Sequence, residues 1–188
     1  MKIDIFIKGN TIDLICLNES IAAESNWKNW FNDEVATKYM QKHYYPNTRE
    51  IQVEFYKNSI ENNPSKLQCG IYHKEDQVLI GVISLNDIDF INRNTELSVI
   101  IGESKYQNMV VLLEAQRLLL RHAFESLNMN KVYGGSAIKE IDMLFCRVLG
   151  YEREGIRSKH MYKNGDYLDV YMFAIFREKY FEKRDRWF

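Results

Sequence analysis

The stretch that decides the fold is residues 95–115, TELSVIIGESKYQNMVVLLEA. Its apolar residues follow a strand pattern as far as Ile101, and helical spacing takes over after Asn108. The sequence therefore predicts a strand, a short loop and a helix that begins at that loop. Because the first turn of a helix has free N–H groups and a positive dipole end, the loop is a candidate anion site.

Length and charge bound the classes of protein to which this chain can belong. It has 188 residues, with 25 Lys and Arg against 26 Asp and Glu, and a formal net charge of −1. The length favours one domain, with residues 1–176 as the core and 177–188 as a C-terminal tail. The near-neutral charge argues against a nucleic-acid partner, because such proteins present a strongly basic surface.

The sequence also argues against a membrane protein and a metalloprotein. No apolar run approaches the roughly 18 residues of a membrane span, and the N-terminal MKIDIFIKGN is too polar for a signal peptide. We therefore expect a cytoplasmic protein without membrane contact. No metal is expected, because Cys16, Cys69 and Cys146 are scattered and the four histidines do not cluster in the sequence.

The elements expected around the opening stretch alternate between strands and helices. In chain order they are a hairpin in 3–17, helices at 21–31 and 48–60, strands at 67–73, 78–88 and 95–101, a helix at 109–126, a strand at 131–133, a helix at 141–149, and a hairpin of 156–162 with 167–176. Asn47 is expected to cap the second helix, with Glu50 three residues later, and Gly150 to end the fourth. This order predicts an α/β (α+β) fold with a mixed, mostly antiparallel central sheet and helices on both faces.

Three stretches in this order resemble the GNAT (Gcn5-related N-acetyltransferase) superfamily. They are WKNWFNDEVATKYM near the start, LIGVISLNDIDFINRNTELSVIIGESKYQ in the middle, and VLGYEREGIRSKHMYKNGDYLDVYMFAI towards the C-terminus. They are similar to the branch that contains ribosomal-protein, spermidine and nucleotide-aminosugar N-acetyltransferases. The resemblance covers nearly the whole chain and implies the GNAT fold.

The resemblance implies acetyl transfer from acetyl-CoA, as co-substrate, to a primary amine. In such enzymes the amine attacks the thioester, a carboxylate assists through water, and a hydroxyl group protonates the departing thiolate. Glu96 matches the carboxylate position and is the candidate base, although a surface glutamate on a strand would look the same. Val99, Ile100 and Ile101 match the strand that pairs with the pantetheine arm, although any buried strand is equally apolar.

The loop after this strand departs from the family pattern. Relatives read Gln/Arg-x-x-Gly-x-Gly/Ala, whereas Asn108 and Val110 stand here at the two glycine positions. Asparagine tolerates left-handed backbone angles, but a branched valine would occupy space that a phosphate needs. The helix start remains a candidate anion site. The candidate cofactor-binding residues here and on the following helices are Gln107, Asn108, Met109, Val110, Val111, Leu112 and Lys139, the last at a position where an asparagine often contacts the cofactor.

The acid that would protonate the thiolate is also altered. Cys146 falls where relatives carry a tyrosine, and a buried core cysteine is the favoured alternative to an acid. Tyr106 is the candidate phenol among three that could substitute, the others being Tyr133 and Tyr151. On the acceptor side, the candidate substrate residues are Trp30, Asn32, Asp33 and Tyr39, which combine flat apolar surfaces with polar groups.

Two classes of function follow from these residues. The first is an N-acetyltransferase acting on a small amine, with a nucleotide-linked amino sugar favoured over a polyamine and a protein N-terminus. The second is a non-enzymatic GNAT-like binding module, because the loop glycines, the asparagine and the tyrosine are all replaced. The aromatic C-terminal tail, REKYFEKRDRWF, indicates either a homodimer contact or packing against the chain itself.

Overall fold

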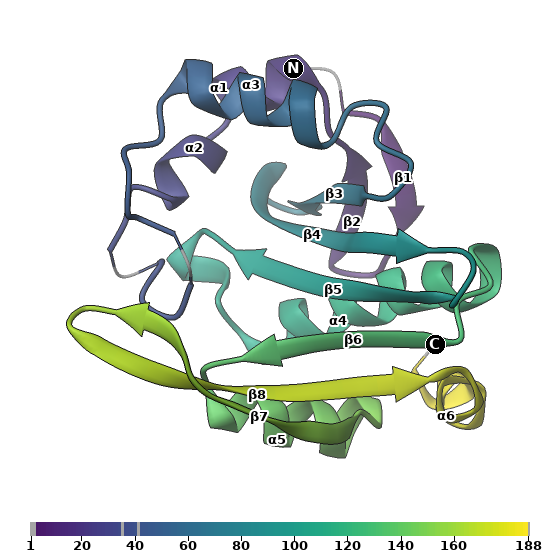
Figure 1. Cartoon of the computed structure of the whole chain (residues 1–188). Coiled ribbons are helices and arrows are strands. Elements are labelled where there is room, and N and C mark those ends of the chain that lie inside the picture. The colour runs from purple at the N-terminus through teal and green to yellow at the C-terminus, as the bar shows by residue number, and fades with distance from the viewer. Residues whose placement is uncertain (1–2, 35, 41, 188) are drawn as a thin grey trace.

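The computed structural model describes residues 3–34, 36–40 and 42–187, which form one central sheet with helices on both faces (Figure 1). The described strands follow the order β1-β2-β3-β4-β5-β6-β8-β7, and every neighbouring pair is antiparallel except β5 with β6. The bounds are β1 Ile5–Lys8, β2 Ile12–Cys16, β3 Leu67–His73, β4 Val78–Asp89, β5 Asn94–Ile101, β6 Lys131–Ser136, β7 Glu152–Lys163 and β8 Asp166–Phe176. The predicted mixed, mostly antiparallel sheet is confirmed.

The helices divide between the two faces of the sheet (Figure 1). They are α1 Glu19–Glu24, α2 Trp27–Trp30, α3 Arg49–Ser59, α4 Met109–Arg121, α5 Lys139–Leu144 and α6 Arg177–Lys183. Alternate residues of β2 show the division, because Leu14 packs in the α4 core while Ile15 packs with α1 and α2. Since successive strand residues point to opposite faces, one sheet serves both cores.

Helix α4 packs one apolar face against the sheet, as its sequence pattern predicts. Val111, Ala115 and Leu118 are buried at helical spacing in the core between α4 and the sheet. The helix continues as a π-helical turn over His122–Ser126, so the predicted end near residue 126 is confirmed. After α5, a second π-helical turn ends at Gly150, whose φ of 82° is the left-handed cap predicted for it.

Two predictions about the first helices are wrong. The helix expected at 21–31 is two short helices, because Ser25 adopts an extended conformation between α1 and α2. Thr48 caps α3 instead of Asn47, and its hydroxyl accepts a hydrogen bond from the Ile51 N–H at 3.3 Å. Asn47 is held elsewhere, because its amide Nδ2 donates to the Lys28 carbonyl at 3.2 Å.

The C-terminal tail packs on the chain itself. Tyr180 of α6 is 0% exposed, its ring stacks on Phe124 at 4.8 Å, and its hydroxyl donates to Glu125 at 2.7 Å. Trp187 then packs on Tyr180, with the two rings 5.5 Å apart. These contacts pack Tyr180 and Trp187 on the chain itself, Phe188 lies outside the described residues, and the homodimer stays a prediction.

Strands β5 and β6 diverge soon after they pair. Their register runs only from Asn94 with Lys131 to Glu96 with Tyr133. Beyond that point residues 97–101 of β5 and 134–136 of β6 have no partner in each other, and Figure 1 shows the two strands separating. The parallel pair therefore splits the sheet near its middle.

Candidate functional site

A cleft of about 1330 Å³ opens where β5 and β6 diverge. Leu97, Val99 and Ile101 line it from the face that packs on α4, while Glu96 and Ser98 line it from the opposite face. The cleft therefore takes side chains from both faces of the sheet.

The edge of β5 inside the cleft can bind an extended ligand through its backbone. Over residues 97–101, the N–H and C=O groups on the β6 side have no strand partner. The Ile101 carbonyl accepts a hydrogen bond from Gln107 Nε2 at 2.9 Å, which fixes the loop that follows. At the point of divergence a Cβ on Gly134 would lie 3.1 Å from the Leu97 carbonyl oxygen, so a larger residue there would crowd the two strands.

Glu96 lies where the two strands begin to separate. It is half-buried, opposite Asn86 of β4 and Tyr133 of β6. Burial is the main cause that raises the pKa of this carboxyl group, and Asp87 adds to it, while Arg157 and Lys66 oppose it. A carboxylate with a raised pKa is a better proton acceptor near neutral pH. The position and environment of Glu96 thus suit a general base.

The start of α4 forms one side of the cleft, although the loop differs from its sequence-based interpretation. Gln107, Asn108, Met109 and Leu112 all line the cleft. Asn108 has an extended backbone with φ −133°, and its side chain accepts a hydrogen bond from the Val111 N–H at 3.1 Å. Asn108 does not use the left-handed conformation that asparagine tolerates, because it serves as the helix N-cap.

The two valines of α4 lie away from the cleft. Val110 is 64% exposed and Val111 is buried in the core, and neither is among the described residues that line the cleft. The expected loss of space for a phosphate at Val110 is not seen. The first turn of α4 remains open beside the cleft.

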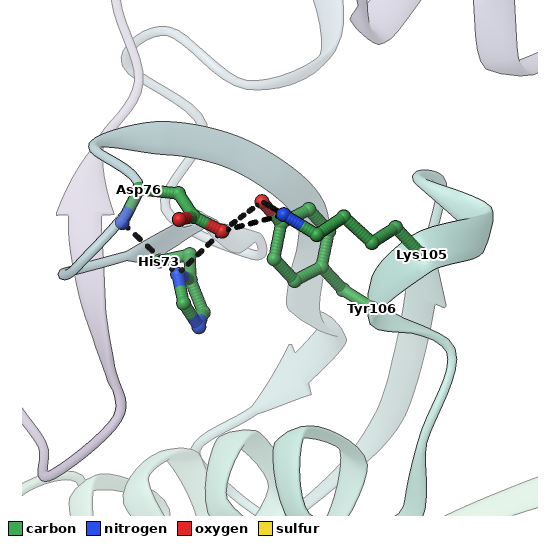
Figure 2. A network of polar contacts seen from close by, with 4 residues as sticks. All are labelled: His73, Asp76, Lys105 and Tyr106. Carbon is green, nitrogen blue, oxygen red and sulfur yellow. Dashed lines mark hydrogen bonds and ion pairs between the residues drawn. The ribbon is translucent and has the colours of Figure 1, made fainter.

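A polar network fixes the loop before α4 to the turn between β3 and β4 (Figure 2). Asp76 accepts hydrogen bonds from the hydroxyl of Tyr106 and, at 3.1 Å, from Lys105 Nζ. The N–H of Asp76 donates to His73 Nδ1 at 3.3 Å, and the His73 and Tyr106 rings lie 4.8 Å apart. The hydrogen bonds from Tyr106 and Lys105 lower the pKa of Asp76. Tyr106, a candidate acid, is therefore engaged outside the cleft.

The other candidate acid and the candidate phosphate contact also lie outside the cleft lining. Cys146 Sγ donates to Asp142 Oδ1 at 3.6 Å, and burial is the main cause that raises its pKa. Its neighbour Phe145 lines the cleft in its place. Lys139, at the start of α5, is not among the described lining residues either. The structure does not bring Cys146 or Lys139 together with Glu96.

Of the four acceptor candidates, Tyr39 alone is among the described residues that line the cleft. Trp30 is 3% exposed, and its indole N–H donates to Glu103 at 2.8 Å. Its ring lies against Gly102, where an added Cβ would come within 1.9 Å of the ring. Trp30 therefore fixes α2 to the end of β5.

Asn32 and Asp33 stabilise the loop after α2. Asn32 Oδ1 accepts from the Asn47 N–H at 2.7 Å, and Asn32 Nδ2 donates to the Asn47 carbonyl at 2.6 Å. Asp33 Oδ1 accepts from the Ala36 N–H at 3.2 Å. Neither side chain is among the described residues that line the cleft, and their contact with a substrate stays a prediction.

Sequence reasoning missed the residues that join this loop to the β7–β8 hairpin. The Tyr44 hydroxyl donates to the Tyr162 carbonyl at 2.5 Å, and Lys163 Nζ donates to the Lys42 carbonyl at 2.7 Å. We call these two contacts the loop–hairpin bridge. Tyr44 and Lys42 both line the cleft, so the bridge borders it. Loop residues have no periodic pattern, and therefore no sequence signal marked them.

The sheet splits at β5 and β6, the one parallel pair among the described strands. A carboxylate lies at the split, and the start of a helix lies beside it. Together these features define the GNAT class of proteins. A family model described as Acetyltransferase (GNAT) domain matches residues 19–142, and the chain belongs to this family.

Known relatives agree with this assignment. One is YdaF of Bacillus subtilis (strain 168), whose name assigns it provisionally to ribosomal N-acetyltransferases, with 27% identity over 115 residues. That match covers 61% of this chain and 61% of YdaF. Another is the spermidine N(1)-acetyltransferase of Vibrio cholerae serotype O1, with 25% identity over 133 residues, 70% of this chain and 75% of the relative.

A crystal structure of spermidine N-acetyltransferase from Vibrio cholerae, in complex with CoA and spermine, has the same fold. It superposes with a TM-score of 0.78 at 22% identity and covers 91% of this chain and 98% of that one. Among the described residues of this chain, no helix combines the length and apolar character that a bilayer crossing requires. Within the same residues, no group of three or more His, Cys, Asp and Glu side chains is placed to hold a metal ion.

Proposed function

We propose that the protein is an N-acetyltransferase that moves the acetyl group of acetyl-CoA to a primary amine. The observation that carries this proposal is the cleft through the sheet, with Glu96 at the split and the start of α4 beside it. Family membership supports it, as does the CoA in the structure of the Vibrio cholerae relative.

The residues that line the cleft fit CoA as a ligand. Val99, Ile100 and Ile101 line the cleft, and the backbone groups of β5 that face away from β4, such as those of Val99, can pair with the amide groups of the pantetheine arm. In the first turn of α4, the N–H groups of Met109 and Val110 have no acceptor within the helix and can bind phosphate oxygens. Acetyl-CoA bound in this way would supply an activated acetyl thioester.

Glu96 would act on the amine. A protonated amine cannot attack, so Glu96 accepts its proton, directly or through one water. The amine nitrogen then forms a bond to the carbonyl carbon, the carbon–sulfur bond breaks, and its electron pair leaves with the sulfur. The second proton of the nitrogen passes to solvent. The departing thiolate is a stable leaving group, because the pKa of an ordinary thiol is about 8.5, and it therefore leaves without help from a strong acid. The positions of Cys146 and Tyr106 outside the cleft are consistent with this sequence.

The structure gives one reason to favour an enzyme over the binding module. A module that had lost its ligand would be expected to fill the space beside α4. Instead Val110 points to solvent, and Met109 is half exposed at the border of an open cleft. One of the relatives described above is named as a spermidine acetyltransferase, and neither of the two names mentions a nucleotide-linked amino sugar. Polyamines, amino sugars and protein N-termini all remain acceptors to be tested.

Two measurements test the proposal. Isothermal titration calorimetry of the purified protein with acetyl-CoA, and with CoA for comparison, should give micromolar dissociation constants. Thiol release from acetyl-CoA in the presence of an amine panel should then depend on Glu96. Glu96→Gln should lower kcat/KM by roughly a hundredfold or more, the usual share of a general base, with little change in acetyl-CoA affinity.

A matched control is Glu152→Gln, which removes the same charge from an exposed position of β7 outside the cleft lining. It should leave both measurements unchanged. No acetyl-CoA binding at millimolar concentration would contradict the proposal, and an unaltered rate in Glu96→Gln would remove Glu96 from it.

A further inference from the structure

The charges that line the cleft are strongly unbalanced. Glu96 is the one carboxylate among the described lining residues, whereas the cations are Lys38, Lys42, Lys66 and Arg157, with His43 and His160 in addition. The chain as a whole has a formal charge of −1, so this excess belongs to the cleft and not to the protein in general. Two positions between α2 and α3, 35 and 41, lie outside the described residues. They are Val and Gln in the sequence and carry no charge.

The positive groups lie on the face of the sheet opposite α4. Lys66 comes directly before β3, whose first residue, Leu67, pairs with Leu85 of β4. Arg157 lies on β7, where it pairs with Val170 of β8. In the strand order these two positions are on either side of β5. Both cations oppose the rise in the pKa of Glu96, so they act on its carboxylate across the cleft.

Two of the lysines are held close together on one aromatic ring. Lys66 Nζ lies 5.3 Å and Lys42 Nζ 6.0 Å from the centre of the Phe55 ring. Lys66 is half-buried, and burial and then Lys42 lower its pKa, while Asp87 and Glu96 oppose that change. Among the described residues, neither lysine forms a salt bridge with a carboxylate. Asp87 and Glu96 offset part of this positive charge, but the cations around the cleft still outnumber these two carboxylates, so a ligand that supplies negative charge is favoured there.

We propose that the acceptor is an anionic amine, a molecule with a phosphate or carboxylate group near its primary amine. Lys66, Lys42 and Arg157 bind the anionic group, and Glu96 faces the amine. This inference rests on the proposed acetyl transfer and adds the class of acceptor to it. A polycation such as spermidine would meet repulsion in this cleft, whereas an amino sugar phosphate would complement it.

The test compares amines that differ only in the anionic group. Glucosamine is paired with glucosamine 6-phosphate and ethanolamine with phosphoethanolamine, and spermidine is the polycation. Binding is measured by calorimetry with CoA present, and acetylation by thiol release. In both pairs the phosphorylated amine should bind roughly tenfold tighter or more, and the preference should shrink as salt is added.

Variants of the cleft cations test whether the preference for the phosphorylated amine comes from the cleft. Lys66→Gln and Arg157→Gln together should bring the binding ratio of each pair close to one, while CoA affinity stays unchanged. Lys57→Gln is the matched control, since Lys57 is an exposed lysine of α3 that pairs with Glu19 at 2.9 Å and is not among the lining residues. It should keep the preference, and circular dichroism confirms that each variant folds.

The outcomes separate this inference from the proposed function. Equal binding within both pairs, or tighter binding of spermidine, overturns the anionic acceptor even if acetylation occurs. A loss of CoA affinity in the double variant also overturns it, because the cations would then serve the CoA phosphates. If no amine is acetylated, the proposed function fails, but the binding ratios still decide whether the cleft selects an anion.

Discussion

At the residue scale, the structure puts Glu96 in an environment that opposes its charge. Burial raises its pKa, and the two cations that face it do not fully offset that effect. The folded protein therefore holds the Glu96 proton more tightly than the unfolded chain does. Stability that Glu96 contributes is complete below the unfolded pKa and is lost as pH rises through the raised folded pKa.

This sign gives two linked expectations for Glu96→Gln. At about pH 7 the variant should unfold at a higher temperature than the parent protein, and at about pH 3 the two should agree. The acetylation rate of the parent should fall as pH drops through the raised pKa, and the residual rate of the variant should lack that step. Thermal unfolding and a pH–rate profile measure both. A variant that is less stable at neutral pH would contradict this account of the Glu96 environment.

Cys146 offers a second expectation at this scale. Its thiol points to Asp142 and lies outside the described lining of the cleft. Cys146→Ala should therefore keep kcat for thiol release within about threefold of the parent, since a general acid would contribute a hundredfold or more. A hundredfold fall in kcat, with the fold intact, would restore Cys146 as the acid.

At the element scale, the network in Figure 2 links the loop before α4 to the β3–β4 turn. Asp76→Asn keeps the size of the side chain but removes the charge that Lys105 and Tyr106 share. We expect a several-fold weaker affinity for acetyl-CoA, because the loop that positions Gln107 and Asn108 loses its anchor. Calorimetry measures it.

The matched control for the network is Asp166→Asn, an exposed aspartate at the start of β8, outside the cleft lining. It should leave acetyl-CoA affinity unchanged. If Asp76→Asn also leaves the affinity unchanged, the network has no part in positioning the loop.

Local patterns explain which elements could be predicted from the sequence. The turn at Asn164 and Gly165 is an example, since both residues have positive φ, 50° and 92°, as the Asn-Gly pair predicts. Gly150 as a helix end and the apolar face of α4 are further examples. Each depends on residues within a few positions of one another, and the GNAT fold followed from their order.

Contacts between distant residues explain what could not be predicted. Trp30 has the flat apolar ring and polar N–H of a typical binding residue, but its ring packs against Gly102 and does not line the cleft. Asn47 looks like a helix cap until its exchange of hydrogen bonds with Asn32, 15 positions away, is known. Lys66 and Arg157 come together only through the strand order. Sequence reasoning therefore pointed to cleft residues on β5, at the start of α4 and at Tyr39, but it missed the cations Lys66 and Arg157.

At the scale of the whole molecule, the C-terminal tail belongs to the main core. The ring of Tyr180 is fully buried between Phe124 and Trp187. Tyr180→Ala should lower the free energy of unfolding by about 3–5 kcal/mol, the usual cost of removing a buried aromatic ring. Denaturant unfolding measures it, with Tyr167→Ala on the exposed β7–β8 hairpin as the control. Equal small losses in both variants would show that the tail adds little.

The split between β5 and β6 has a consequence for the order in which two substrates would bind in the proposed acetyl transfer. Because the cleft takes side chains from both faces of the sheet, a donor beside α4 and an acceptor beside Glu96 can approach from opposite sides. Neither needs to leave before the other arrives. Direct transfer within a ternary complex then replaces an acylated enzyme, and double-reciprocal plots of initial rate should intersect and not run parallel.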